Sequence, residues 1–114
     1  MIEKEVNFRR KMIVEKVKAI VEEDFGDAEL NIKKIGEEKL FLTPDYIGRV
    51  FKKETGESLK VYINRVRVEK AKELIRGNKH KMHEVAKLCG FDNNAKYFSC
   101  VFKKVAGVYP CEYK

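Results

Sequence analysis

Apolar side chains recur along this chain at intervals of three and four residues, the spacing that places them on one face of an α-helix. Strand-like alternation of apolar and polar residues is scarce. The pattern therefore predicts an all-α protein. We expect helices at residues 8–24, from about 31 to 40, at 44–55, at 58–76, at 82–88 and at 94–106, with a last turn beginning near Pro110.

The apolar residues that share one face of each predicted helix are expected to form the core. In chain order these residues are Ile13, Val17, Ile20, Val21, Ile32, Ile35, Leu40, Ile47, Val50, Phe51, Leu59, Tyr62, Ile63, Val66, Leu74, Ile75, Val85, Ala86, Phe98, Val101, Phe102 and Val105.

Residues that favour the ends of helices punctuate this pattern. Pro44 suits the first position of a helix, where its missing N–H costs nothing, and Gly56 suits the end of the same helix. Gly36 is unusual inside a helix, because glycine costs about 1 kcal/mol relative to alanine there, and it predicts a close approach by another helix. Side chains able to cap a helix N-terminus precede three of the predicted helices, at Asn31, Thr43 and Ser58.

The segment VFKK occurs at residues 50–53 and again at 101–104, a separation of 51 residues. The same shift aligns YIGRVFKKETGESLKVY with YFSCVFKKVAGVYPCEY. Each copy combines a short predicted helix, a tight turn and a second helix whose outer face carries lysines. This order is typical of the helix-turn-helix motif, so the sequence predicts two such motifs joined by a long helix.

The charge of the chain is unevenly distributed. The net charge is +7, but residues 1–30 carry six basic and eight acidic side chains, whereas the remaining residues carry nineteen and ten. The positive charge therefore belongs to the part that contains the repeat. Such a surface favours an anionic partner, either nucleic acid or an acidic membrane, and the alternative is a basic protein with no polyanion partner.

Several function classes find no support in the sequence. No run of eighteen apolar residues is present, and the start, MIEKEVNFRRK, lacks the features of a signal peptide. An odd number of cysteines, Cys89, Cys100 and Cys111, indicates reduced thiols in a cytoplasmic protein. His80 and His83 lie near Cys89 without completing a set of metal ligands, and no phosphate loop or nucleophile motif appears. We therefore expect no enzyme activity, no cofactor, no metal and no membrane partner.

From about Val14 onward, the chain resembles the DNA-binding domain of the AraC/XylS family of bacterial transcription regulators. The resemblance is carried by FLTPDYIGRVFKKETG, YINRVRVEKAKELI and GFDNNAKYFSCVFKKVAGVYPCEY. It implies about seven helices, arranged as two helix-turn-helix subdomains joined by one long helix. The first of these segments looks most like regulators whose amino-terminal half is a two-component receiver. We expect an N-terminal extension at 1–12 and the DNA-binding domain at 13–114, with helix-turn-helix motifs at about 31–56 and 81–107 around a linker helix at about 58–76.

The resemblance also implies which side chains meet DNA. Arg49 faces outward on the first recognition helix, where arginine can form two hydrogen bonds with guanine. Asp45 can accept a hydrogen bond from cytosine N4, or it can instead interact favourably with the helix dipole. On the second helix the matching positions give Lys96 and Ser99 as base contacts. Contacts with the DNA backbone are expected from Lys52, Lys53, Lys103, Lys104, Asn93 and Asn94, of which the two asparagines are also candidate caps.

The chain departs from the family pattern at three places. One residue more than usual separates Gly90 from Tyr97, which predicts a longer second turn or an earlier helix start. Cys100 stands where relatives commonly carry arginine, and Gly48 has no side chain. We therefore do not expect base-specific contacts from Gly48 or Cys100.

The sequence is best explained as the output domain of a bacterial transcription regulator that binds a specific double-stranded DNA sequence in the major groove. RNA polymerase is a second candidate partner. We expect the isolated domain to be a monomer, with a longer natural protein that dimerises. Two alternatives remain open, a nonspecific or architectural DNA binder and a helical protein-interaction module with an incidental basic face.

Overall fold

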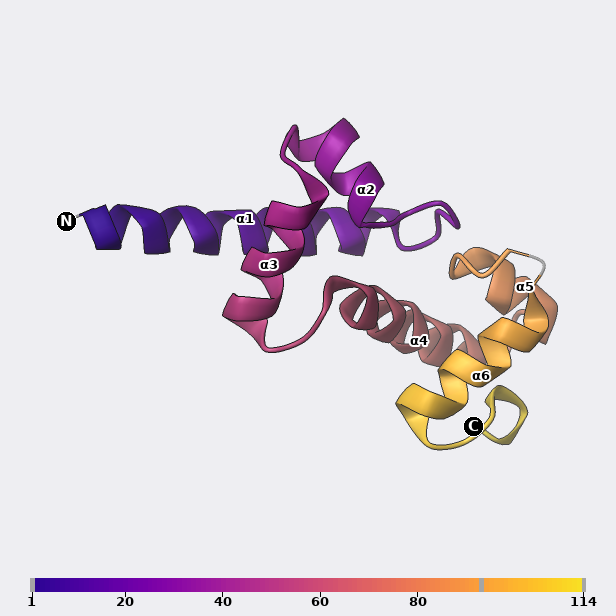
Figure 1. The fold of residues 1–114 in the computed structure, drawn as a ribbon. Coiled ribbons are helices and arrows are strands. Elements are labelled where there is room, and N and C mark those ends of the chain that lie inside the picture. Colours follow the sequence, from indigo (N-terminus) through magenta and orange to yellow (C-terminus); the bar gives the residue numbers. More distant parts are fainter. Residues whose placement is uncertain (1, 93, 114) are drawn as a thin grey trace. The chain divides into compact units, whose positions relative to one another are not determined.

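The computed structural model describes the chain from residue 2 to residue 113, except for residue 93 (Figure 1). In these residues every regular element is a helix, as the apolar spacing predicted. A π-helical segment and a 3-10 turn accompany six α-helices. In chain order the elements are α1 (Ile2–Asp24), α2 (Ile32–Lys34), η1 (Ile35–Leu40), α3 (Pro44–Thr55), α4 (Leu59–Gly77), α5 (Met82–Leu88), α6 (Ala95–Ala106) and η2 (Pro110–Glu112).

The chain divides into two compact units. Unit 1 comprises the residues up to Asp24 together with Leu30–Ile63, and unit 2 comprises Phe25–Glu29 together with the residues from Asn64 onward. The loop after α1 therefore belongs to unit 2, although the helices on either side of it belong to unit 1. Helix α4 begins in unit 1 and continues into unit 2.

In unit 1, α3 packs across α1 (Figure 1). The ring of Phe51 in α3 lies 5.3 Å from the ring of Tyr62 at the start of α4. The buried apolar residues of this unit are Ile13, Val14, Val17, Val21, Leu30, Ile35, Ile47, Val50, Phe51, Leu59, Tyr62 and Ile63. Helices α1, α3 and α4 thus share one core.

Helix α1 differs from the sequence prediction in its start and in its buried face. It begins at Ile2 rather than near Phe8, because no proline or glycine interrupts residues 2–8. Val14 is buried, whereas Ile20, predicted to face inward, lies half-buried at the edge of the stripe. The N-terminal half of α1 is therefore a largely exposed continuation of the packed half.

The second predicted helix is also irregular, since its α-helical turn passes into the π-helical segment η1. The wider π turn changes the phase of the helix, so that Ile35 and Gly36 are buried while Ile32 and Leu40 are only half-buried. A Cβ on Gly36 would lie 2.6 Å from the Leu42 carbonyl oxygen and 3.2 Å from Ile47 Cδ1. The close approach expected at Gly36 thus exists, and it is made by the following turn as well as by α3.

The core of unit 2 is a cluster of residues from α4, α5, α6 and the turn between α5 and α6. Its aromatic rings lie in series, with 5.1 Å between Phe91 and Phe98 and 5.8 Å between Phe98 and Phe102. The cluster consists of Val68, Ala71, Val85, Ala86, Cys89, Phe91, Phe98, Val101 and Phe102. Val105 was expected to join it but is 36% exposed in the last turn of α6, where Ala106 packs against the cluster instead.

Candidate nucleic-acid interface

Helices α3 and α6, which carry the repeated VFKK segment, begin and end at equivalent positions of the repeat. Each has 12 residues and ends at a left-handed glycine, Gly56 with φ 85° and Gly107 with φ 86°. Thr43 Oγ1 accepts a hydrogen bond from the Tyr46 N–H at 3.4 Å, and Asn94 Oδ1 accepts one from the Tyr97 N–H at 3.0 Å. Both caps and both stops are thus separated by the same 51 residues.

This register answers the question raised by the extra residue between Gly90 and Tyr97. Because Asn94 caps α6 as Thr43 caps α3, α6 begins at the position equivalent to the start of α3. Asn93 lies outside the described residues. The predicted cap at Asn94 is confirmed.

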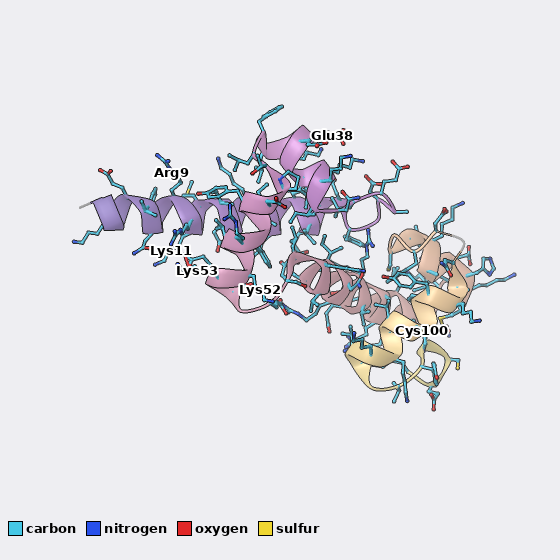
Figure 2. All side chains as sticks on the ribbon, viewed as in Figure 1. Arg9, Lys11, Glu38, Lys52, Lys53 and Cys100 are labelled. Carbon is cyan, nitrogen blue, oxygen red and sulfur yellow. The ribbon has the colours of Figure 1, made fainter. Side chains whose placement is uncertain are left out.

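The outer face of α3 is polar and exposed. Asp45, Arg49, Lys52 and Lys53 are exposed, and Figure 2 shows the two lysines near the end of the helix. The opposite face buries Ile47, Val50 and Phe51 as predicted. Gly48 is half-buried, and a Cβ there would lie 2.9 Å from Ile32 Cδ1, so this position faces α2.

The outer face of α6 is less uniform. Lys96, Cys100, Lys103 and Lys104 are exposed, and Cys100 projects from the helix in Figure 2. Ser99, predicted to contact a base, is half-buried and so is less exposed than these four residues. Position by position, α6 therefore presents lysine where α3 presents aspartate, and a thiol where α3 presents a guanidinium.

Lys103 is oriented by its neighbours at the end of α6. Its Nζ lies 4.9 Å from the centre of the Tyr109 ring and donates a hydrogen bond to the Gly107 carbonyl at 3.3 Å. Such cation–π contacts at exposed sites contribute about 0.5–1 kcal/mol. The residue 51 positions before Tyr109 is Ser58, so the copy of this lysine in α3, Lys52, has no corresponding ring.

Other candidate chemistry is limited. The three cysteines are free thiols, and burial raises the pKa of Cys89 to about 11, which keeps that thiol protonated and unreactive at neutral pH. Across residues 2–92 and 94–113, no three His, Cys, Asp or Glu side chains gather into a possible metal site. In the same ranges no helix has the length and apolar character needed to cross a bilayer.

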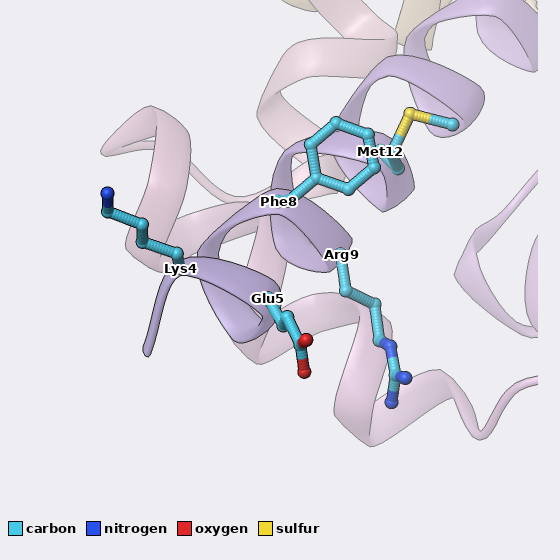
Figure 3. Close-up of a pocket in the computed structure, with 5 residues that line it drawn as sticks. All are labelled: Lys4, Glu5, Phe8, Arg9 and Met12. Carbon is cyan, nitrogen blue, oxygen red and sulfur yellow. The ribbon is translucent and has the colours of Figure 1, made fainter. Parts of the chain in front are cut away.

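A shallow hollow lies on the surface of α1 and is lined by that helix alone (Figure 3). Phe8 and Met12 lie side by side there, with Lys4, Glu5 and Arg9 around them. Phe8 is 66% exposed, so the hollow does not enclose a ligand as catalytic pockets usually do.

Two structural features were not predicted from the sequence. Arg67, which the predicted core of the long helix did not include, is buried in unit 2. No local signal in the sequence marks this burial, because the carbonyls that Arg67 bonds are about 40 residues away. Glu84 caps α5, since its Oε1 accepts a hydrogen bond from the Lys81 N–H at 2.8 Å, and that bond lowers the pKa of Glu84. A glutamate three residues after the N-cap position, here Lys81, is a recognised signal for such a cap.

The paired helices, their turns and their basic outer faces define a helix-turn-helix protein. A family model described as "Helix-turn-helix domain" matches residues 38–114. The uncharacterized transcriptional regulatory protein YesN of Bacillus subtilis is 37% identical over 103 residues, which are 90% of this chain and 28% of YesN. This chain thus spans little more than a quarter of that relative's length.

Two solved structures are similar over most of their length. The C-terminal domain of AraT, a response regulator from Geobacillus stearothermophilus, has a TM-score of 0.84 and 34% identity, and the alignment covers 89% of this chain and 82% of AraT's. The C-terminal domain of the two-component response regulator yesN from Fusobacterium nucleatum has a TM-score of 0.81 and 33% identity, covering 87% of this chain and 94% of that one. The chain belongs to the AraC/XylS-type helix-turn-helix family. This is a family of DNA-binding transcription regulators rather than enzymes.

Proposed function

We propose that this chain binds a specific double-stranded DNA sequence, with α3 and α6 each lying in the major groove, as the output domain of a two-component transcription regulator. The observation that carries the proposal is the matched pair of helices, each capped, stopped and basic at the same positions. Helix-turn-helix proteins place such a second helix in the major groove, which repeats about every 34 Å along one face of DNA. A chain with two equivalent helices is suited to reading two successive turns.

On α3, Arg49 is the proposed reader of base identity. Its guanidinium is exposed on the face opposite the buried Val50 and Phe51, and the planar fork matches the two acceptors of guanine. Asp45 lies one turn earlier on the same exposed face. From there its carboxylate is proposed to accept a hydrogen bond from the N4 amino group of a cytosine in a neighbouring base pair. Its position in the first turn of α3 also favours the helix dipole.

On α6, Lys96 and Ser99 are the proposed base contacts. Lys96 occupies the first turn, as Asp45 does in α3, and is exposed. Ser99 is half-buried, so its hydroxyl can reach only a base edge that comes close to the helix surface. Both residues bond several bases rather than one, which makes α6 the less selective helix.

The remaining contacts are proposed to go to phosphate. Lysines Lys52, Lys53, Lys103 and Lys104 lie in the last turns of the two helices. Phosphate contacts fix the register of a protein on the duplex without reading its sequence. Asn94 uses its Oδ1 as a cap, which leaves its amide NH2 free to donate a hydrogen bond to phosphate. A phosphate contact is also proposed for Asn93, which lies outside the described residues.

We place the DNA-binding domain at 13–114, with helix-turn-helix motifs at about 31–56 and 81–107 and the linker helix at about 58–76. Of the N-terminal extension at 1–12, residues 2–12 lie in α1, and residues 4–12 of it are largely exposed. In the intact regulator this domain works in the cytoplasm and RNA polymerase is a second partner. The isolated domain is proposed to be a monomer, while the intact regulator dimerises.

Selection of bound sequences from random duplex DNA tests the proposal. Recovery of one fixed motif, followed by tighter binding to that motif than to a shuffled duplex of equal length, supports specific recognition. Salt-sensitive binding without any enriched motif would identify a nonspecific or architectural binder instead. Absence of DNA binding at low salt would favour the protein-interaction module.

A further inference from the structure

Arg67 is a charged side chain in the interior of unit 2 and is 7% exposed. Removing a guanidinium from water is costly unless hydrogen bonds replace the lost hydration. Arg67 donates from Nε to the Phe25 carbonyl at 3.1 Å and from Nη2 to the Asp27 carbonyl at 2.8 Å. Burial nevertheless lowers the pKa of Arg67 from its ordinary value. The guanidinium therefore bonds to the backbone of the loop that follows α1, about 40 residues away in sequence.

The same guanidinium contacts the turn that precedes α6. Its Cζ lies 5.8 Å from the centre of the Phe91 ring. Gly90 has φ 86°, and a Cβ built there would lie 2.4 Å from the Phe25 carbonyl oxygen and 2.8 Å from Arg67 Nε. The turn thus approaches both the arginine and the loop so closely that a side chain at position 90 has no room.

A second close approach joins the loop to α5. A Cβ on Gly26 would lie 2.8 Å from the Leu88 carbonyl oxygen, at the end of α5. In Figure 1 the loop after α1 accordingly runs beside α5. The loop itself is tightened by the Asp27 side chain, whose Oδ1 accepts a hydrogen bond from the Glu29 N–H at 2.9 Å. Loop 25–29 and the α5–α6 turn therefore form one packed assembly around Arg67.

From this assembly a series of aromatic contacts leads into α6. Phe91 lies beneath Arg67 and packs against Phe98 at 5.1 Å, and Phe98 is 1% exposed in the second turn of α6. The Phe91 ring also lies 5.9 Å from the ring of Tyr97, the residue before Phe98. The angle at which α6 leaves its turn thus depends on the position of Phe91, and the Arg67 guanidinium holds one side of that ring.

We propose that Arg67 is a positioning residue for DNA reading, which fixes the orientation of α6 by fastening the α5–α6 turn to loop 25–29. The proposal rests on the function proposed above. It assigns no contact with DNA to Arg67. The role requires a planar guanidinium that bonds the Phe25 and Asp27 carbonyls at once while it lies on the Phe91 ring. The single ammonium of lysine cannot make this set of contacts.

The test is Arg67→Lys, which keeps the charge and removes the fork. Arg65→Lys is the matched control, because it makes the same change two residues away on the exposed side of α4. Both variants are measured against the selected DNA site and against versions of it in which either half is scrambled. Hydrogen exchange is measured in residues 88–92 and, for comparison, in α3.

Arg67→Lys is expected to weaken binding to the full site by about tenfold, corresponding to about 1.4 kcal/mol. The loss should fall on the half read by α6, with unchanged discrimination in the half read by α3 and faster exchange only in residues 88–92. Arg65→Lys should match the wild type in all three respects. The proposal would be overturned if Arg67→Lys lost affinity equally in both halves of the site. It would also be overturned if the variant kept wild-type discrimination in the α6 half and wild-type hydrogen exchange in residues 88–92. Either result would leave Arg67 as a contributor to stability alone.

A second variant serves if Arg67→Lys does not fold. Asp27→Ala removes the acceptor that tightens loop 25–29 without altering the core, and it should give the same one-sided loss at smaller size. Unchanged reading by α6 in that variant counts against the proposal. If the wild-type chain selects no DNA motif, the proposed function fails, and the exchange of residues 88–92 still decides whether Arg67 holds the turn.

Discussion

Phe41 and Asp92 lie 51 residues apart and share a left-handed backbone conformation, with φ angles of 56° and 52°. Each lies two positions before the cap of a repeated helix, so the backbone conformation agrees at this equivalent position before α3 and α6. This conformation is uncommon for residues with a Cβ, although aspartate tolerates it better than bulky residues do. Phe41 is 82% exposed, so contacts of its ring do little to offset the cost.

Replacing Phe41 with glycine is therefore expected to raise the free energy of unfolding by about 1 kcal/mol, since glycine adopts this conformation without steric cost. Asp92→Gly makes the matched change in the second turn and should gain less. Urea unfolding followed by circular dichroism measures both values. A gain at Asp92 as large as that at Phe41 would show that backbone strain does not distinguish the two turns.

Cys89 provides a pH-dependent contribution to stability. Burial raises the pKa of this thiol to about 11 in the folded chain, against about 8.5 for an unfolded cysteine. Because the folded pKa is the higher one, the contribution is fully present below about pH 8.5 and is lost as the pH rises towards 11. The difference between these two pKa values corresponds to a total loss of about 3.4 kcal/mol. Unfolding of the wild type and of Cys89→Ala from pH 7 to 11 isolates it, since other groups titrate in both proteins. Parallel stability profiles would contradict this expectation.

Arg49 and Lys103 should affect DNA binding in different ways. Arg49→Ala is expected to cost about 1–3 kcal/mol on the selected site and much less on random DNA, because it removes a base contact. Lys103→Ala should weaken both DNAs equally and reduce the log–log salt slope by about 0.9, because it removes one phosphate contact. Binding titrations over a range of salt measure these effects.

The control for the arginine is Arg49→Lys, which retains the charge but not the planar fork. It should keep the salt slope of the wild type while losing selectivity. If Arg49→Ala weakens the selected and random DNAs alike, Arg49 contacts only the backbone.

The two halves of the DNA site should differ in stringency. Helix α3 presents a guanidinium at Arg49, whereas α6 presents Cys100 at the matching position, a weak hydrogen-bond partner. Because both helices share one register, the comparison is between equivalent positions. A mismatch scan of the selected site should show about 1–3 kcal/mol per substituted base pair in the α3 half and less in the α6 half. Equal penalties in both halves would contradict the asymmetry.

Local signals explain what could be predicted from the sequence. The caps at Thr43 and Asn94, the stop at Gly56 and the buried face of α3 depend on residues a few positions apart, and these were predicted correctly. The early start of α1 lies in an exposed stretch that has no apolar periodicity to mark it. The π turn and the exposure of Val105 depend on how elements pack, which periodicity does not encode. The burial of Arg67 depends on two carbonyls about 40 residues away, so no local pattern could reveal it. The proposed DNA contacts follow from position on exposed faces and from family resemblance together.

The assignment of Phe25–Glu29 to unit 2 has a consequence for how this protein could have diversified. A duplicated motif suggests that either half could be exchanged between relatives as a single stretch of gene. Here the second half includes five residues encoded before most of the first half, and they carry both carbonyls that Arg67 requires. Recombination at the α4 boundary alone would separate Arg67 from the loop whose carbonyls it bonds. Chimaeras that move the second half without residues 25–29 should therefore lack the loop that matches their Arg67, so the two halves are expected to evolve as a pair.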